Sequence, residues 1–273
     1  MTRVFSRRTG ATPFSLVGLL LILSVVLFPI FWVVLTSFQR EVDTIQWPPR
    51  LLFTPTLINY RKILAIGLVS GLKNSLVVAC ITTAITFLLG SPFAYLIARH
   101  SFRYRENIRF WILTLRVMPP IVVIVPFIFL WFKLGLLDTY LALVVTYLTL
   151  SLPLFVWLSV ECFRSIPEEV EEAAFLEGCS LGRVFVNISI PLALPGLISV
   201  LFFTFIFIWN EFFFAFALTS QLQTLPLVVA AQAQSVYAVP WGTTSAFTVI
   251  LSIPPVVLLS SLVRFLAKYF IIS

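Results

Sequence analysis

Residues 171–191 read EEAAFLEGCSLGRVFVNISIP and interrupt a chain that is otherwise apolar and nearly uncharged. The stretch carries three glutamates and one arginine, and Gly178 divides its acidic beginning from an apolar pattern that ends at Pro191. A polar segment between two long hydrophobic ones is expected to face water, because charged side chains are costly in hydrocarbon. The stretch therefore separates two membrane-embedded parts of the chain.

The composition of the whole chain indicates a lipid bilayer. Of its 273 residues, 60% are hydrophobic and 11% are charged, and the mean hydropathy is +1.07. A soluble domain carries about 25% charged residues. The net charge of +7 does not indicate nucleic acid, because the basic residues lie at the ends of apolar segments. Cys80, Cys162 and Cys179 form no CxxC pair and no metal-like cluster with His100, so no metal site is expected.

Six stretches are apolar and long enough for a bilayer-crossing helix, which needs about 20 residues. The first is too long for a signal peptide and lacks a cleavage site, so it is expected to be a retained helix. The runs show no alternating barrel pattern. The predicted fold is an all-α membrane protein with a cytoplasmic helix–Gly–helix elbow between spans 4 and 5. The six predicted spans are residues 13–38, 73–98, 108–133, 139–160, 192–218 and 244–268.

Lysine and arginine predict the orientation of these spans, because cytoplasmic loops of membrane proteins are enriched in both. With the N-terminus inside, the outer segments carry fewer basic residues, all of them before the second span. Both termini and residues 171–191 are therefore expected in the cytoplasm. The basic residues expected inside are Arg3, Arg7, Arg8, Arg99, Arg103, Arg105, Arg109, Arg164, Arg183, Arg264 and Lys268. Those expected outside are Arg40, Arg50, Arg61, Lys62 and Lys73.

The cytoplasmic segment has the local signals of two short helices. Ser165 and Glu168 have the spacing of a capping box, and Pro167 suits a first helical turn. Glutamates crowd the first turns, where the helix dipole favours negative charge. Gly178 is placed to end this helix in the left-handed conformation. A second, amphipathic helix is predicted after it and ends at Pro191.

The acidic character of the elbow bears on what it contacts. Val170, Ala173, Ala174 and Glu177 have the i, i+3, i+4, i+7 spacing of one helix face, and the two alanines are expected to make the middle of that face thin, so that another surface can approach closely. An amphipathic helix lying on the inner membrane surface is one alternative, but it would carry lysine and arginine on its polar face. Glutamates instead favour a basic protein partner.

The residues resemble a known signature at this point. Three pieces resemble the EAA loop, E-A-A-x3-G-x9-I-x-L-P: Glu172-Ala173-Ala174, then Gly178 after three intervening residues, then Ile188-x-Ile190-Pro191 after nine more. That loop is typical of inner-membrane permease subunits of binding-protein-dependent ABC importers. Further stretches resemble the carbohydrate branch of that family, in particular its maltose-permease-G-like members. They are Asn74-Ser75, Arg116-Val-Met-Pro-Pro120, Lys133-Leu-Gly-Leu-Leu-Asp-Thr139, Trp209-Asn210-Glu211-Phe212 and Thr224-Leu225-Pro226.

The resemblance implies partners for the chain. They are a second permease subunit, a dimer of ABC ATPase subunits, and an extracytoplasmic substrate-binding protein, assembled in a prokaryotic inner membrane. Residues 1–70 are expected to form an N-terminal tail, the first span and an outer loop, and residues 71–273 the importer transmembrane domain, with the EAA loop at about 165–191. The residues expected to couple to the ATPase are Glu168, Glu172, Ala173, Ala174, Gly178 and Leu181.

No catalytic residue is expected. The chain has no G-x4-GK-[ST] phosphate loop, so ATP and Mg are expected on the partner ATPase and no cofactor on this chain. Arg116, Asn210 and Glu211 lie within predicted spans, where polar and ionisable groups usually have a function. They are candidates for the substrate path or a gate. A structural polar contact between helices, for example between Arg116 and Glu211, is the alternative.

Other functions stay open at this level. Glycerol 3-phosphate or a polyamine are alternative substrates within the same superfamily, although a polyamine path would need several acidic residues and Glu211 is nearly alone. An ion-coupled secondary transporter would need carboxylates near the middle of the membrane, and the spans hold almost none. A membrane hydrolase is poorly supported, because His100 has no evident nucleophile beside it.

Overall fold

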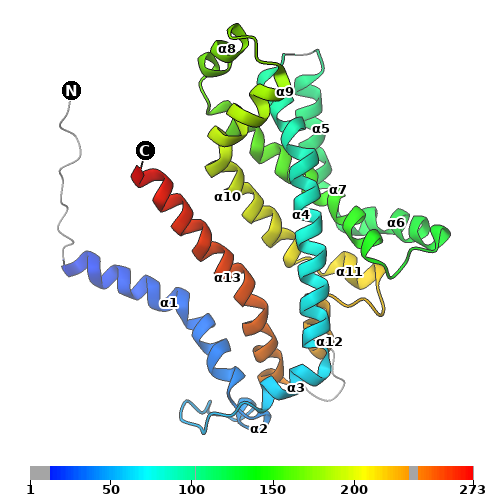
Figure 1. Ribbon diagram of the computed structural model, residues 1–273. Helices are drawn as coiled ribbons and strands as arrows, with labels where there is room; N and C mark the ends of the chain where they lie inside the picture. Colours follow the sequence, from blue (N-terminus) through cyan, green and yellow to red (C-terminus); the bar gives the residue numbers. More distant parts are fainter. Residues whose placement is uncertain (1–12, 102, 234–238, 273) are drawn as a thin grey trace. The chain divides into compact units, whose positions relative to one another are not determined.

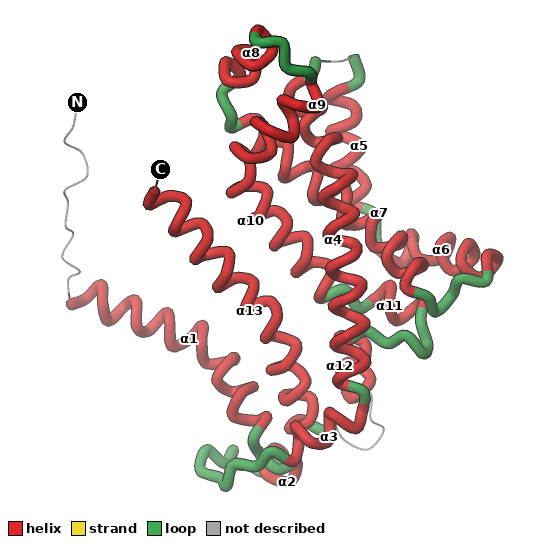
Figure 2. Tube along the Cα trace, viewed as in Figure 1, coloured by secondary structure: helices red, strands yellow, loops and turns green. Residues whose placement is uncertain are grey.

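The computed structural model describes residues 13–101, 103–233 and 239–272, and these residues are helical almost throughout, with no strand among them (Figures 1 and 2). The helices are α1 (Pro13–Ser37), α2 (Glu41–Thr44), α3 (Ile58–Ile66), α4 (Leu68–Arg99), α5 (Arg105–Val117), α6 (Pro120–Leu134), α7 (Tyr140–Arg164), α8 (Glu168–Leu176), α9 (Leu181–Val184), the π-helical segment η1 (Phe185–Ser189), α10 (Ile190–Trp209), α11 (Phe213–Leu218), α12 (Leu225–Ala233) and α13 (Trp241–Ile272). The expected all-α class is confirmed.

The chain forms two compact units. The first contains residues 1–66 and 232–250, and the second contains residues 67–231 and 251–273. The predicted boundary between residues 70 and 71 stays a prediction, because compactness alone does not define a domain. The second unit contains the elbow and all of the predicted site residues.

Five segments within the described residues are long and apolar enough to cross a membrane, and the predicted third span is not among them. They are Leu16–Ser37, Leu68–Arg99, Tyr140–Arg164, Leu181–Trp209 and Trp241–Tyr269. Residues 108–133 are instead split between α5 and α6 by Met118 and Pro119, both in extended conformation. Each of these residues precedes a proline, which disfavours the helical conformation. At 15 residues, α6 is roughly 22 Å long, against a hydrocarbon core of about 30 Å.

The predicted fifth span is also interrupted. Residues 192–218 were expected to form one helix, but α10 ends at Trp209 and α11 begins at Phe213. The indole Nε1 of Trp209 donates to the carbonyl of Leu251 over 3.0 Å and ties the end of α10 to α13. The break leaves Asn210 and Glu211 in the connection between the two helices.

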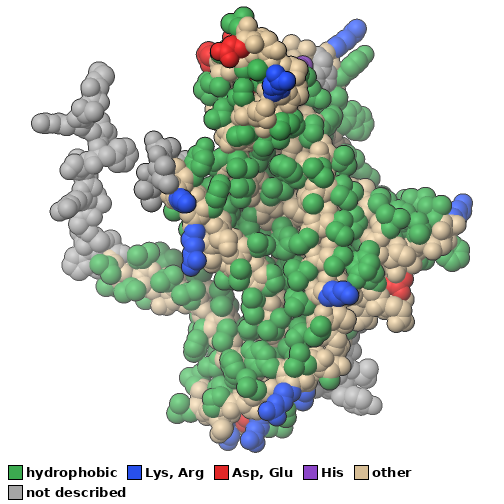
Figure 3. Space-filling view, in the orientation of Figure 1, with side chains coloured by type: hydrophobic (Ala, Val, Ile, Leu, Met, Phe, Trp, Pro, Cys, Tyr) green, Lys and Arg blue, Asp and Glu red, His purple; other side chains and the backbone are tan. Residues whose placement is uncertain are grey.

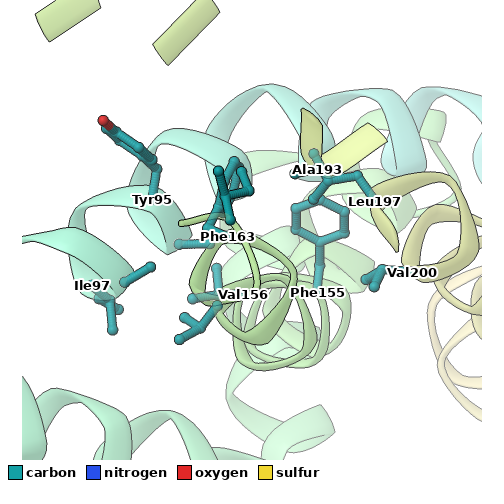
Figure 4. Close-up of a cluster of buried hydrophobic side chains, with 12 residues drawn as sticks. Tyr95, Ile97, Phe155, Val156, Phe163, Ala193, Leu197 and Val200 are labelled. Atoms are coloured by element: carbon teal, nitrogen blue, oxygen red, sulfur yellow. The ribbon is translucent and has the colours of Figure 1, made fainter. Parts of the chain in front are cut away.

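The core of the second unit lies between α4, α7 and α10. Figure 4 shows the aromatic and aliphatic side chains that fill it, including Phe155 and Phe163 of α7 and Leu197 of α10. Gly90 lets α4 approach α7, because a Cβ at that position would lie 2.5 Å from Phe155 Cδ1. Small residues at helix contacts are the usual means of close packing in membranes. The elbow is joined through the chain to two of these three helices, α7 and α10.

Two polar contacts organise the first unit. The buried side-chain amide of Asn59 in α3 donates to the backbone carbonyls of Ser37, which ends α1, over 2.9 Å and of Gln39 over 2.7 Å. The carboxylate of Glu41 accepts from the backbone N–H of Gly242 over 3.0 Å and of Thr243 over 2.9 Å. An anionic acceptor satisfies the free N–H groups at the start of a helix, here α13.

Asp138 clamps the loop between α6 and α7 to the loop that follows α11. Its carboxylate accepts from the backbone N–H of Ser220 over 3.0 Å, of Gln221 over 2.9 Å and of Leu222 over 2.8 Å, and from the Ser220 hydroxyl over 3.0 Å. Burial opposes ionisation of the Asp138 carboxyl, but the hydrogen bonds from these backbone and hydroxyl donors outweigh it and lower its pKa. The clamp therefore depends on the ionised form.

We expect Asp138→Asn to lower the unfolding free energy at pH 7 by about 2 kcal/mol, because hydrogen bonds to a charged acceptor are the stronger ones. Since the folded-state pKa lies below the unfolded one, this stabilisation is complete above about pH 4 and is lost as pH falls through the folded-state pKa. Thermal unfolding of the purified protein in detergent should show a wild-type advantage that shrinks in strong acid. Asp43→Asn is the control, because the Asp43 carboxylate lies 3.7 Å from exposed Arg50 and, among the described residues, accepts no set of backbone hydrogen bonds like that of Asp138. Equal midpoints for wild type and Asp138→Asn at pH 7 would contradict the clamp.

Candidate functional site: the elbow and the membrane cavity

The elbow begins with α8, but without the capping box that the sequence predicts. Ser165 has helical dihedral angles (φ −71°, ψ −13°) and belongs to the end of α7. Its hydroxyl donates to the carbonyl of Cys162 over 2.8 Å, and Pro167, which precedes α8, makes no side-chain cap. The prediction was wrong because α7 stays helical to Arg164 and holds Ser165 in its last turn.

Gly178 turns the chain between α8 and α9. Its φ is +86°, the left-handed region that favours glycine. Its N–H donates to the carbonyl of Phe175 over 3.0 Å, and the N–H of Cys179 donates to that of Ala174 over 3.0 Å. This pair of hydrogen bonds is the Schellman motif, which closes a helix and redirects the chain. A Cβ on Gly178 would meet no atom within 4 Å, so its backbone conformation, and not lack of space, requires glycine.

The two alanines of the elbow lie on different surfaces. Ala174 is buried against its own chain, whereas Ala173 is exposed. The prediction of one thin face that contains both was therefore wrong: they are neighbours in the sequence and about 100° apart around the helix. Ala173 remains available to a partner.

The four other predicted coupling residues are exposed, as Ala173 is. Glu172, Gly178 and Leu181 face outward, and the Glu168 side chain is 72% exposed. Beside them lies Leu176, which the sequence analysis did not single out and which is 89% exposed. In Figure 3 acidic side chains gather over α8, above a surface that is mostly hydrophobic. The elbow therefore presents both carboxylates and a large apolar side chain.

Glu171, which was not predicted as a site residue from the sequence, is 4% exposed. Its Oε2 lies 3.0 Å from Arg99 Nε and accepts from the Tyr95 hydroxyl over 3.0 Å, and its Oε1 accepts from the Ser189 hydroxyl over 2.8 Å. Glu171 stands three positions before buried Ala174, which places both on one helix face. That spacing was the available signal, but the pairing with Arg99 depends on the tertiary fold.

Arg99 ends α4 and joins further groups to this network, which we call the elbow network (Tyr95, Arg99, Glu171 and Ser189). Its Nη2 donates to the carbonyl of Ile166 over 2.8 Å, between α7 and α8. Its Nη1 lies 3.7 Å from the carboxylate of Glu168. The Arg99 side chain is itself buried.

A cavity of about 720 Å³ lies in the same unit, where α10 is interrupted. Asn210 and Glu211 line it together with aromatic side chains, among them Phe207 and Phe212, and with Thr149. The carboxylate of Glu211 also accepts from the N–H of Phe214 over 3.0 Å, so it caps α11. This bond gives Glu211 a structural role besides its place in the cavity.

Arg116 is the third residue predicted on the substrate path. It lies in α5, and its side chain is outside the residues whose side chains the structure describes. Its neighbours Leu115 and Met118 line the cavity. The predicted contact between Arg116 and Glu211 stays a prediction.

Several long apolar helices and a polar elbow define a multi-pass membrane protein. Residues 88–271 match the family model of the binding-protein-dependent transport system inner membrane component. The chain belongs to this family. It is 33% identical over 250 residues to the trehalose/maltose transport system permease protein MalG of Thermococcus litoralis, covering 89% of each chain. It is 32% identical over 241 residues to the trehalose transport system permease protein SugB of Mycobacterium tuberculosis, covering 87% of this chain and 88% of SugB.

A solved structure supports the fold. A chain of a bacterial ABC transporter involved in the import of the acidic polysaccharide alginate aligns with a TM-score of 0.74 at 20% identity, over 97% of this chain and 99% of that one. At this identity the likeness concerns the fold alone.

Proposed function

We propose that this chain is a permease subunit of an ATP-driven importer and that its cargo is a carbohydrate delivered by an external binding protein. Family membership supports the transporter class, and the names of the curated relatives support the carbohydrate. The same findings do not favour an ion-coupled transporter or a polyamine permease. The chain performs no chemistry of its own; ATP and Mg bind the partner ATPase subunits.

The elbow is the observation that carries this proposal. It joins α7 to α10 through a short helix, a left-handed glycine and a second helical turn, and it presents carboxylates and Leu176 to the outside. A partner that holds α8 can move two membrane helices at once. We propose that the elbow and both termini lie in the cytoplasm of a prokaryotic cell, and that α5 and α6 together provide the sixth crossing.

The cavity beside Asn210 is proposed as part of the substrate path. Aromatic faces pack against the apolar faces of sugar rings, and an amide can both donate to and accept from sugar hydroxyls. The side-chain amide of Asn210 donates to the carbonyl of Ile206 over 2.9 Å, which leaves its oxygen available. The second permease subunit would close the path.

The substrate class can be tested with the purified complex of both permeases and the ATPase, reconstituted with its binding protein. ATPase activity should rise with one or a few members of a sugar panel and should not rise with glycerol 3-phosphate or spermidine. Stimulation by glycerol 3-phosphate or spermidine alone would contradict the carbohydrate assignment. Sugar stimulation without the binding protein would contradict delivery by such a protein.

A further inference from the structure

The elbow network connects the elbow to α4. The chain segments on either side of the elbow lead to α7 and α10, and not to α4. Residues 165–167 join α8 to α7, and α9 and η1 join it to α10. Arg99 and Tyr95 belong to α4, and their contacts with Glu171 bring that helix into the same assembly. Helix α4 and the η1 segment that leads into α10 therefore meet at one buried carboxylate, and residues 165–167 connect the same helix α8 to α7.

Glu171 cannot serve as a docking residue in this arrangement. It is buried, and both carboxylate oxygens have partners within the chain. Glu168 and Glu172, by contrast, are exposed on the same helix. Glu168 and Glu172 are therefore available to a partner, whereas Glu171 is not. This difference indicates that Glu171 has another role.

The ion pair is fixed from several sides. The Arg99 guanidinium pairs with Glu171 and also donates to the carbonyl of Ile166, at the start of the elbow. The Tyr95 ring packs against Phe185 and Phe163, with centroid distances of 5.0 and 5.5 Å. Removing one partner of a buried pair leaves the other charge uncompensated, so a sliding motion between α4 and α8 is disfavoured.

We infer that the Arg99–Glu171 pair makes α4 move together with the elbow, so that movement of the ATPase reaches a third membrane helix. Arg99 and Glu171 are positioning residues: they contact neither ATP nor substrate. The inference rests on the proposed function, because it requires that an ATPase moves the elbow. The elbow is connected to α7 and α10 through the chain, and the ion pair would transmit its movement to α4 without a covalent link.

The test uses the complete complex in proteoliposomes, with uptake and ATP hydrolysis measured on the same sample. Glu171→Gln and Arg99→Lys should leave the ATPase subunits bound and hydrolysis active, while uptake per ATP falls about 10-fold. The double variant should be no worse than the worse single variant, as expected for residues that act as a pair. Arg164→Gln removes an arginine from the exposed pair with Glu161 on α7 and should leave uptake per ATP unchanged.

Two results would overturn the inference: an unchanged uptake per ATP in both single variants, or a parallel loss of assembly, hydrolysis and uptake. Arg99→Lys keeps a positive charge beside Glu171, so this variant is expected to fold. A lower uptake per ATP in it can then be assigned to coupling and not to misfolding. Glu172→Gln distinguishes this inference from the proposed function, because the exposed Glu172 should affect binding of the ATPase. Normal ATPase binding in Glu172→Gln and in a variant at Leu176 would count against docking at the elbow, whatever the result for Glu171.

Discussion

Leu176→Glu is expected to separate the chain from its ATPase subunits and to abolish ATP-driven uptake. Leu176 is 89% exposed on α8, and an interface that covers it would bury most of its surface. A carboxylate there would replace an apolar contact with a charge that loses its hydration in the interface, and the neighbouring glutamates would repel it. Central apolar contacts of an interface are worth about 2 kcal/mol or more, which is roughly a 30-fold loss of affinity. Co-purification of the ATPase with tagged permease measures this loss.

The control for this variant is Leu52→Glu. Leu52 is 94% exposed and lies in the loop between α2 and α3, away from the elbow in sequence. Its substitution introduces the same charge on an equally exposed leucine and should leave the ATPase bound. If Leu176→Glu retains the ATPase as fully as Leu52→Glu does, α8 is not the docking surface.

Gly178→Val should reduce uptake by about 10-fold or more, whereas Gly178→Asn should retain most of it. A β-branched residue at φ +86° is strained by about 1–2 kcal/mol or more, and relief of that strain would break the two hydrogen bonds that close α8. Asparagine tolerates the left-handed conformation. Uptake of a labelled sugar into proteoliposomes measures the difference, with membrane insertion checked by protease protection.

The two Gly178 variants also distinguish two causes of reduced uptake: strain in the backbone at Gly178 and a steric clash with a partner protein. The site has open space within the chain, so size alone does not disturb the elbow itself. If asparagine and valine are equally harmful, the cause is a clash with a partner and not the backbone conformation. Full uptake by Gly178→Val would show that the turn is dispensable.

Local sequence signals predicted those features that depend on neighbours along the chain. The glycine that ends α8 is an example, because its conformation follows from helix closure within a few residues. The capping box at Ser165 also matched a local pattern, yet it was wrong because α7 did not end early enough. A capping-box pattern indicates a possible helix start. Whether a helix begins there depends on where the preceding helix ends.

Features that depend on tertiary packing could not be predicted. Glu171 resembles its exposed neighbours in sequence, and its burial follows from Tyr95, 76 positions earlier, and from Arg99. The interruption at Asn210 has no proline or glycine to announce it, and Glu211 caps the following helix from within the break. The break at Met118, in contrast, could have been predicted, because two consecutive prolines follow it.

The central claim is that this chain moves its cargo only when an ATPase drives it through the elbow. The direct measurement is uptake of labelled sugar into proteoliposomes that contain either this chain alone or the complete complex with its binding protein. We expect uptake only with the complete complex and hydrolysable ATP, and none with a non-hydrolysable analogue beyond a single turnover. Uptake by this chain alone, or uptake driven by an ion gradient without ATP, would contradict the claim.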